Sequence, residues 1–437
     1  MLFTAIRFVV AQGYRDRVNR NCLPFAHACE RFGKTNMYGR PLAASKQGCE
    51  MVRKMPTPPN TLDDEIAHWL RTGHPGDGIR RAPAQELLLR IDLNGVAPLL
   101  VATPGIAEMP DALQHALEAR RIGREMWEAQ HRRIVSEAID SLVQAGLQPL
   151  VMKGTALAYS HYTDSAARVR GDSDLMVEET GRASAFASLE QAGFRPDRGA
   201  GGVMRVAARL FQKPDLAGKL HDIDLHWRLN SSRVLAGLFD HGELLARSVP
   251  LPELGPDARG FGAVDELIFT AVHRVKHVEG ATFYYINGEA HATPDSLIWL
   301  MDIHLLFRDM SDAERITLCE RAAQKGVSGI LAGALIRSKM RLGTEVPEDV
   351  LETLDSAAPS DIARYLKAPP VRQVLMDMAS MDEIGSKLQF VRETLFPSRE
   401  FMRTRFPEAR LRWLPWLYLR RLVGRFGQLL RREGPAR

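Results

Sequence analysis

Apolar residues recur at helical spacing over most of this chain. Between residues 113 and 146 they form one long stripe that includes Ile134, Ala138 and Leu142, and the stripe stops at Gly146. A glycine directly after such a stripe is typical of a helix end, so we expect one long helix here. After Asp257 the same spacing predicts further helices, over residues 265–278, 294–309, 312–326 and 328–342.

The middle of the chain follows a different pattern. Residues 149–152 form a short apolar run, and residues 169–177 and 219–227 alternate in polarity, so each predicts a strand. We expect a tight turn at 153–155, with helices at 156–162 and 181–192 between the strands. The predicted fold is α+β, with a small mixed sheet, helices before it and a larger helical region after it. The expected divisions are 1–60 (a poorly ordered extension), 61–146 (helical), 147–256 (α/β core), 257–395 (helical) and 396–437 (a basic, aromatic tail).

Acidic side chains lie on one face of two predicted strands. Asp172 and Asp174 are two positions apart, and so are Asp222, Asp224 and His226. Alternate residues of a strand point the same way, so these side chains form polar rows. Adjacent carboxylates repel each other unless a cation lies between them, and magnesium prefers oxygen ligands. Three acids on two strands suggest a two-metal phosphoryl-transfer site. Asp222 competes with Asp224 for the third position.

A phosphate-binding segment precedes these acids. Lys153 supplies a positive charge, Gly154 permits a turn whose backbone N–H groups face a phosphate, and Thr155 adds a hydroxyl. Arg168 and Arg170 come just before the acids, where guanidinium groups could clamp phosphate oxygens.

The composition is that of a globular protein, and the distribution of charge bears on whether the chain binds nucleic acid. The chain has 437 residues, of which 45% are hydrophobic and 25% charged, as in ordinary globular proteins. The net charge of +5 is concentrated at the C-terminal end, because residues 396–437 contain eleven arginines and three acids. The rest is slightly acidic, so a basic nucleic-acid-binding body is not indicated. The cysteines form no CxxC pair, and a reduced, cytoplasmic protein is expected.

Several of these motifs together resemble a known family. Residues 152–158, 168–177, 223–227, 273–277, 299–304 and 396–397 are similar to the bacterial uncharacterised nucleotidyltransferases, a branch of the DNA polymerase beta-like nucleotidyltransferase superfamily. The resemblance extends over residues 61–432. It implies a mixed-sheet core and transfer of a nucleoside monophosphate from an NTP, most readily ATP, to a hydroxyl of a small molecule or protein.

The resemblance also implies roles for single residues. Asp172 and Asp174 would bind two magnesium ions, with manganese as an alternative, and Asp224 would complete the site and act on the incoming hydroxyl. Gly154 and Thr155 match the phosphate-binding turn, although Gly-Ser is usual there. Apart from the resemblance, the position of His226 beside Asp224 suggests that it touches the substrate or nucleotide, or that it orients the aspartate. The i, i+4 spacing of His273 and His277 on a helix favours packing near the cleft or contact with the substrate over a shared metal site.

Two alternatives to this function remain open. One is a non-catalytic accessory protein that retains the fold and serves a biosynthetic cluster. The other is an antitoxin-like nucleotidyltransferase that modifies a partner protein. The Arg-rich tail offers a contact to a protein or to the inner face of a membrane, besides the simpler alternative of a helix packed on the body.

Overall fold

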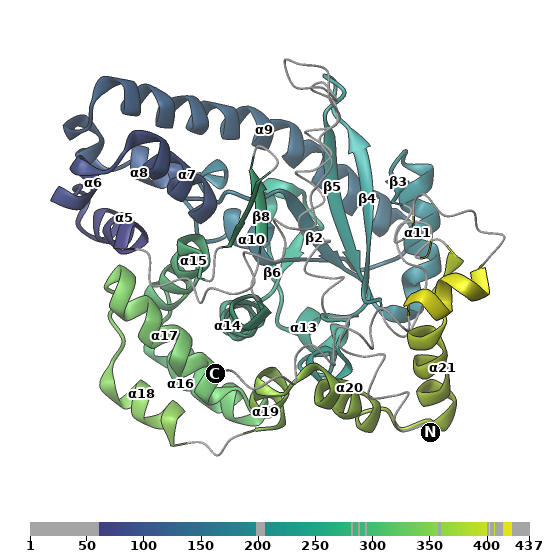
Figure 1. The fold of residues 1–437 in the computed structure, drawn as a ribbon. Coiled ribbons are helices and arrows are strands. Elements are labelled where there is room, and N and C mark those ends of the chain that lie inside the picture. The colour runs from purple at the N-terminus through teal and green to yellow at the C-terminus, as the bar shows by residue number, and fades with distance from the viewer. Residues whose placement is uncertain are drawn as a thin grey trace.

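The computed structural model describes residues 61–197, 206–280, 283–286, 289–292, 295–356, 360–399, 402, 406 and 414–421. Helices surround one mixed sheet (Figure 1), which confirms the predicted α+β class. Residues 1–60, which we expected to be poorly ordered, and most of the predicted basic tail (396–437) lie outside the described residues. Within the tail, residues 414–421 are helical, and the Tyr418 hydroxyl donates a hydrogen bond to the Pro397 carbonyl oxygen at 2.7 Å.

A helical region comes first and ends in the long helix that the apolar stripe predicted. Its helices are α5 (Thr61–Thr72), α6 (Asp77–Arg81), α7 (Ala84–Asn94), α8 (Ala97–Val101) and α9 (Asp111–Gln144). Gly146 has a φ of 78°, and its N–H donates to the Val143 carbonyl oxygen while the Leu147 N–H donates to that of Leu142. This pair of hydrogen bonds is a Schellman motif, which explains why α9 ends where it does.

The sheet has the strand order β3-β4-β5-β2-β1-β7-β6. Its strands are β1 (Leu150–Met152), β2 (Asp172–Met176), β3 (Arg195–Pro196), β4 (Ala208–Pro214), β5 (Leu220–His226), β6 (Val249–Pro250) and β7 (Arg259–Gly260). The β2–β5 and β1–β7 pairs are parallel, and the remaining pairs are antiparallel. A separate hairpin consists of β8 (Phe283–Ile286) and β9 (Glu289–Ala292).

The two faces of the sheet have different chemistry. Val151, Leu175, Ile223 and Leu225 point to one face and form an apolar core with helices α9 and α11 (Arg182–Gln191). Because side chains alternate along a strand, the acidic residues between them point to the opposite face. The core on the α9 side therefore fixes the direction in which the acids project.

The segment after β1 differs from the prediction. We expected a tight turn at 153–155 and a helix from 156, but helix α10 (Lys153–Ala158) begins at Lys153. Lys153 has a φ of 59°, so one left-handed residue makes the change of direction that the predicted turn would have made. Strands β3, β4, β6 and β7 were also not predicted. Three of them are only two residues long, too short to show alternation.

Helices dominate again after the sheet, as predicted. After β7 they are α14 (Ala263–Gly280), α15 (Leu297–Arg308), α16 (Asp312–Gln324), α17 (Ser328–Leu342), α18 (Glu348–Asp355), α19 (Asp361–Lys367), α20 (Pro370–Ala379) and α21 (Ile384–Leu395). Two short helices, α12 (Arg233–Ala236) and α13 (His241–Ala246), lie between β5 and β6. Helix α14 is seen end-on near the centre of the molecule, with α15, α16 and α17 packed against it (Figure 1). The acidic face of the sheet is thus close to the helical region.

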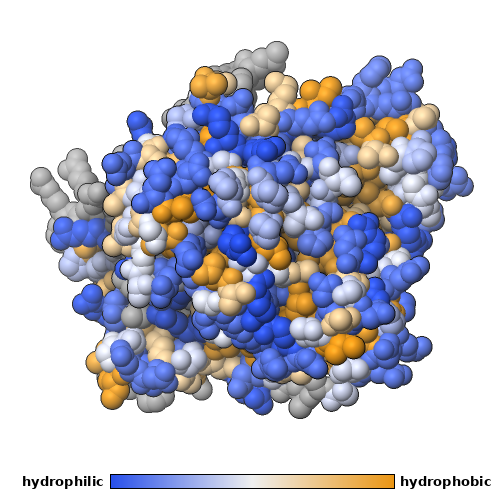
Figure 2. Space-filling view, turned by 180° about the vertical axis from the view of Figure 1, so that it is seen from behind, coloured by the Kyte–Doolittle hydropathy of each residue, from blue (hydrophilic) through white to orange (hydrophobic). Residues whose placement is uncertain are grey.

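Hydrophilic side chains cover most of the face seen from behind, and hydrophobic ones lie between them in small separate groups (Figure 2). Of the helices in the described part of the chain, none has both the length and the apolar character needed to cross a bilayer.

Candidate metal centre and nucleotide site

Parallel pairing of β2 with β5 brings the predicted acids together. Asp172 lies opposite Asp222, and Asp174 lies opposite Asp224. All four are on the face that points away from α9. Asp174 and Asp222 are buried, whereas the Asp224 side chain is 30% exposed. The arrangement forms a compact patch of four carboxyl groups, of which those of Asp172 and Asp224 are partly accessible.

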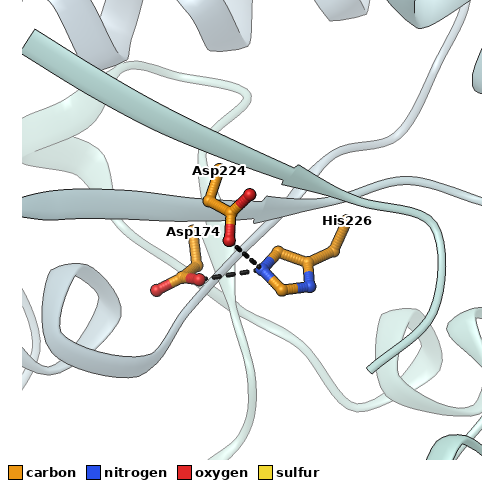
Figure 3. Close-up of side chains that lie close together, drawn as sticks. All are labelled: Asp174, Asp224 and His226. Atoms are coloured by element: carbon orange, nitrogen blue, oxygen red, sulfur yellow. Dashed lines mark hydrogen bonds and ion pairs between the residues drawn. The ribbon is translucent and has the colours of Figure 1, made fainter. Parts of the chain in front are cut away.

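His226 joins two of these carboxylates. Its Nε2 lies 2.8 Å from Asp174 Oδ1 and 3.2 Å from Asp224 Oδ2 (Figure 3). Burial alone would lower the pKa of His226, but Asp224 and the hydrogen bond to Asp174 raise it. One ligand atom from each of the three residues lies within 4.8 Å of the other two. Among the described residues, this is the set of side chains placed to hold a metal ion.

Asp172 and Asp174 have pKa values moved in opposite directions. Burial and the neighbouring Asp174 charge raise the pKa of Asp172 to about 7. Burial acts on Asp174 in the same sense, but Lys153 and His226 outweigh it and lower its pKa to about 2. Asp172 does not belong to the 4.8 Å group. Asp174 is therefore the permanently charged member of the pair.

Asp222 has a different environment. Its Oδ1 accepts a hydrogen bond of 2.8 Å from Gln212 Nε2 on β4. The carboxylate is buried and is also absent from the 4.8 Å group. The geometry thus places Asp224, and not Asp222, in the group with Asp174 and His226. The alternation pattern could not make this choice.

Lys153 contacts the acids directly. Its Nζ donates to Asp174 Oδ1 at 2.5 Å. Burial alone would lower the pKa of Lys153, but Asp174 and Asp224 raise it. The ammonium group is therefore a positive charge within the patch of carboxylates.

Gly154 and Thr155, which follow Lys153, lie in the interior against the two arginines that precede β2. A Cβ added to Gly154 would lie 3.2 Å from the guanidinium carbon of Arg168, so the glycine makes room for that side chain. Thr155 Oγ1 lies 2.7 Å from Ser173 Oγ, and it accepts a hydrogen bond from Arg170 Nε at 3.1 Å. The Thr155 side chain is 1% exposed and points into this network.

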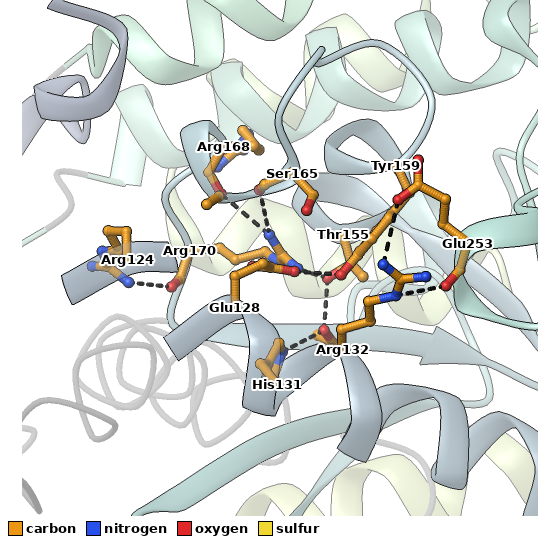
Figure 4. Close-up of polar contacts among 12 residues, drawn as sticks. Arg124, Glu128, His131, Arg132, Thr155, Tyr159, Ser165, Arg168, Arg170 and Glu253 are labelled. Carbon is orange, nitrogen blue, oxygen red and sulfur yellow. Dashed lines mark hydrogen bonds and ion pairs between the residues drawn. The ribbon is translucent and has the colours of Figure 1, made fainter. Parts of the chain in front are cut away.

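Arg168 and Arg170 are both buried and paired with acids. Arg168 donates two hydrogen bonds to Asp302 on α15, at 2.7 and 2.6 Å. Arg170 donates to Glu128 on α9 at 2.6 Å, and the Tyr159 hydroxyl donates to the same oxygen (Figure 4). These ion pairs connect the loop before β2 to two helices. The predicted phosphate clamp stays a prediction.

His273 and His277 lie together on α14. Their Nε2 atoms are 3.1 Å apart, and the ring of Trp299 is 5.2 Å from that of His277. Burial and the mutual proximity of the two rings lower the pKa of His273, and burial lowers that of His277 to about 3. Lys153 contributes to both shifts, so the histidine pair lies near the acidic patch.

Glu266 belongs to the same face of α14 and was not predicted. It precedes His273 by seven residues and His277 by eleven, which is the spacing of one helix face. The residue is 2% exposed, so its carboxyl group is buried. Burial and the Asp302 charge raise its pKa to about 8, whereas the Lys153 backbone and ammonium act in the other direction. An acid within the apolar segment 263–272 was the signal that could have identified it.

The ion-pair partners Asp302 and Glu128 were also missed. Asp302 was part of a motif that carried the family resemblance, but neither acid had been given a role. Both partners are far from the arginines in sequence, and only the tertiary fold shows the pairing.

Comparison with known proteins identifies the family. The family described as "Uncharacterised nucleotidyltransferase" matches residues 81–358, which is more than half of the chain. No curated protein shows a significant match.

Proposed function

Because the chain belongs to the uncharacterised nucleotidyltransferase family, we propose that it transfers a nucleoside monophosphate from an NTP, foremost ATP, to a hydroxyl of a small molecule or protein. The observation that carries this proposal is the convergence of Asp174, Asp224 and His226 on two parallel strands, with one ligand atom of each within 4.8 Å of the others. Nucleotidyl transfer needs such a group because the triphosphate carries several negative charges that a cation must offset.

The donor set fits a divalent ion. The two carboxylates suit Mg²⁺ or Mn²⁺, and the imidazole favours Mn²⁺ because Mg²⁺ prefers oxygen ligands. Asp172, two residues before Asp174 on β2, would support a second ion. Asp174, Asp224 and His226 would hold the first ion. When bound, divalent ions neutralise charge on the phosphates and make a hydroxyl more acidic.

The protein's side chains would orient the acceptor, accept its proton and offset the charge of the leaving group. Asp224, the most exposed of the three, would orient the acceptor hydroxyl and take its proton. The hydroxyl oxygen would form a bond to the α-phosphorus as the bond to pyrophosphate breaks. Lys153 would offset charge on the departing pyrophosphate. His273 and His277, both neutral at pH 7, would line the acceptor side.

Arg168 and Arg170 would be positioning residues and would not contact the phosphates themselves. Each is already paired with a buried acid, and breaking such a pair to reach a phosphate would leave that acid uncompensated. We therefore assign them to holding Gly154 and Thr155 in place, so that backbone N–H groups of this segment meet the phosphates.

Labelled nucleotides test the proposal directly. ATP, CTP, GTP and UTP, each labelled at the α-phosphorus, are incubated with the protein, Mg²⁺ or Mn²⁺, and a cell extract. We expect transfer of the α-label, and none of a γ-label, since pyrophosphate leaves. A labelled protein band identifies a protein acceptor, and a labelled small compound identifies a metabolite.

The matched variants are Asp174→Asn and Asp312→Asn. Asp312 is 93% exposed on α16 and is not one of the acids of the patch, so its variant should keep full activity. Asp174→Asn should lose at least about a hundredfold in rate while keeping its circular dichroism and melting temperature close to those of the wild type. Full activity in Asp174→Asn would contradict the site, and no transfer with any nucleotide would favour the accessory alternative.

A further inference from the structure

Lys153 has the position and charge of a bound cation. Its ammonium donates to Asp174 Oδ1, the same oxygen that His226 contacts. The Lys153 and Asp174 side chains are 21% and 9% exposed, so water screens their attraction only in part. Asp174, Asp224 and Asp172 all raise the pKa of Lys153 against the effect of burial. The ammonium group thus contacts one carboxylate, that of Asp174, and is attracted by two more.

The backbone of Lys153 is also unusual. Among the described residues, it is the one non-glycine residue with a positive φ, at 59°. A side chain destabilises this conformation, and glycine would adopt it freely. Strained backbone of this kind is found mostly at functional sites. A lysine where glycine would fit better indicates that the ammonium itself is needed.

We propose that the Lys153 ammonium is a resident counterion, which occupies the cation position beside Asp174 in the metal-free protein and leaves it when a divalent ion binds. The reason is electrostatic. Asp174 Oδ1 cannot ligate a divalent ion and keep an ammonium at 2.5 Å without strong repulsion between the two cations. This inference rests on the proposed function, because it takes Asp174 as a metal ligand.

Two consequences follow for binding. The divalent ion competes with an internal positive charge, so its affinity in the absence of nucleotide is weakened. The displaced ammonium becomes free to pair with a phosphate, so nucleotide and metal favour each other's binding. Lys153 thereby couples loading of the metal to the arrival of the triphosphate.

Calorimetric titration with Mn²⁺ alone tests the competition. The variants are Lys153→Met, which keeps an unbranched side chain but removes the charge, and Lys153→Arg, which keeps the charge. We expect Lys153→Met to bind Mn²⁺ about tenfold more tightly than the wild type, corresponding to 1.4 kcal/mol. Lys153→Arg should resemble the wild type. Equal or weaker binding by Lys153→Met would overturn the inference and leave the metal site itself intact.

A measurement on the wild-type protein avoids any folding defect of the variants. Acetylation of single lysines is followed by mass spectrometry with and without Mn²⁺ and a non-hydrolysable ATP analogue. Lys325 is the matched control, since its side chain is 20% exposed and its Nζ lies 2.8 Å from Glu243. Mn²⁺ alone should increase the reactivity of Lys153, and the analogue should reduce it again, while Lys325 stays constant. Unchanged Lys153 reactivity with bound Mn²⁺ would overturn the inference, and a wild type that binds no Mn²⁺ even in the presence of the ATP analogue would overturn the proposed function as well.

Discussion

The charge state and contacts of the site residues depend on the side chains that the tertiary fold brings next to them. Alternation along the strands correctly predicted that Asp172 and Asp174 share a face, and that Asp222, Asp224 and His226 do so too. It could not predict that Asp174 contacts Lys153 and His226, because those contacts depend on how β1, β2 and β5 pair. The same limit explains why Glu266 was missed, since its burial depends on helices far along the chain.

Glu266 makes stability depend on pH. Its pKa rises from an ordinary 4.5 to about 8 on burial. Between these values the folded protein holds a proton that the unfolded chain has lost, so stability is fully present below about pH 4.5 and falls as the pH rises toward 8. Glu266→Gln removes the ionisable group. We expect the variant to melt about 2 °C or more above the wild type at pH 8, and close to it at pH 4.5.

The control for this measurement is Glu320→Gln, a change on the exposed side of α16. Its melting temperature should follow that of the wild type at every pH. If the Glu266→Gln curve also runs parallel to the wild-type curve from pH 4.5 to 8, Glu266 does not titrate as described.

At the scale of elements, long periodic segments were predictable and short ones were not. Helices α9, α14, α15, α16 and α17 appear close to the predicted ranges because each has several turns of apolar spacing. The pairing order of the sheet is a property of strands that meet across the chain, so no local pattern specifies it. The parallel register of β2 with β5 is what turns two separate acidic motifs into one patch.

Gly154, the second residue of α10, has little room for a side chain. A Cβ there would lie 3.2–3.3 Å from the Arg168 guanidinium, which Asp302 holds in place. Since the arginine cannot yield freely, we expect Gly154→Ala to reduce the free energy of unfolding by ~1–3 kcal/mol. Denaturant unfolding measures the change. Gly171→Ala is the control, because no neighbouring atom lies within 4 Å of its added Cβ. Equal stability of the two variants would show that the contact carries no strain.

At the scale of the molecule, a buried ion pair connects the sheet to the helical region. Arg168, just before β2, and Asp302 on α15 have side chains 8% and 2% exposed. The Tyr162 hydroxyl donates to the same carboxylate at 2.8 Å. The predicted order of helices, sheet and helices is confirmed, but this connection was not predictable, because 134 residues separate the partners.

A double-mutant cycle tests this connection. Arg168→Met leaves Asp302 buried and unpaired, so it should reduce the free energy of unfolding by ~3–5 kcal/mol. The double variant Arg168→Met/Asp302→Leu should recover part of that loss, because no isolated charge remains. Arg364→Met, in an exposed pair with Asp361, should cost ~1 kcal/mol or less. Additive effects of the two buried substitutions would mean that the pair does not act as a unit.

The most direct test of the metal centre is a crystal structure of the protein with Mn²⁺ and a non-hydrolysable ATP analogue, using the anomalous signal of manganese. A peak is expected between the carboxylates of Asp174 and Asp224, within reach of His226 and with the Lys153 ammonium moved off Asp174. Bound analogue with no anomalous peak at these residues, or with a peak elsewhere, would contradict the account.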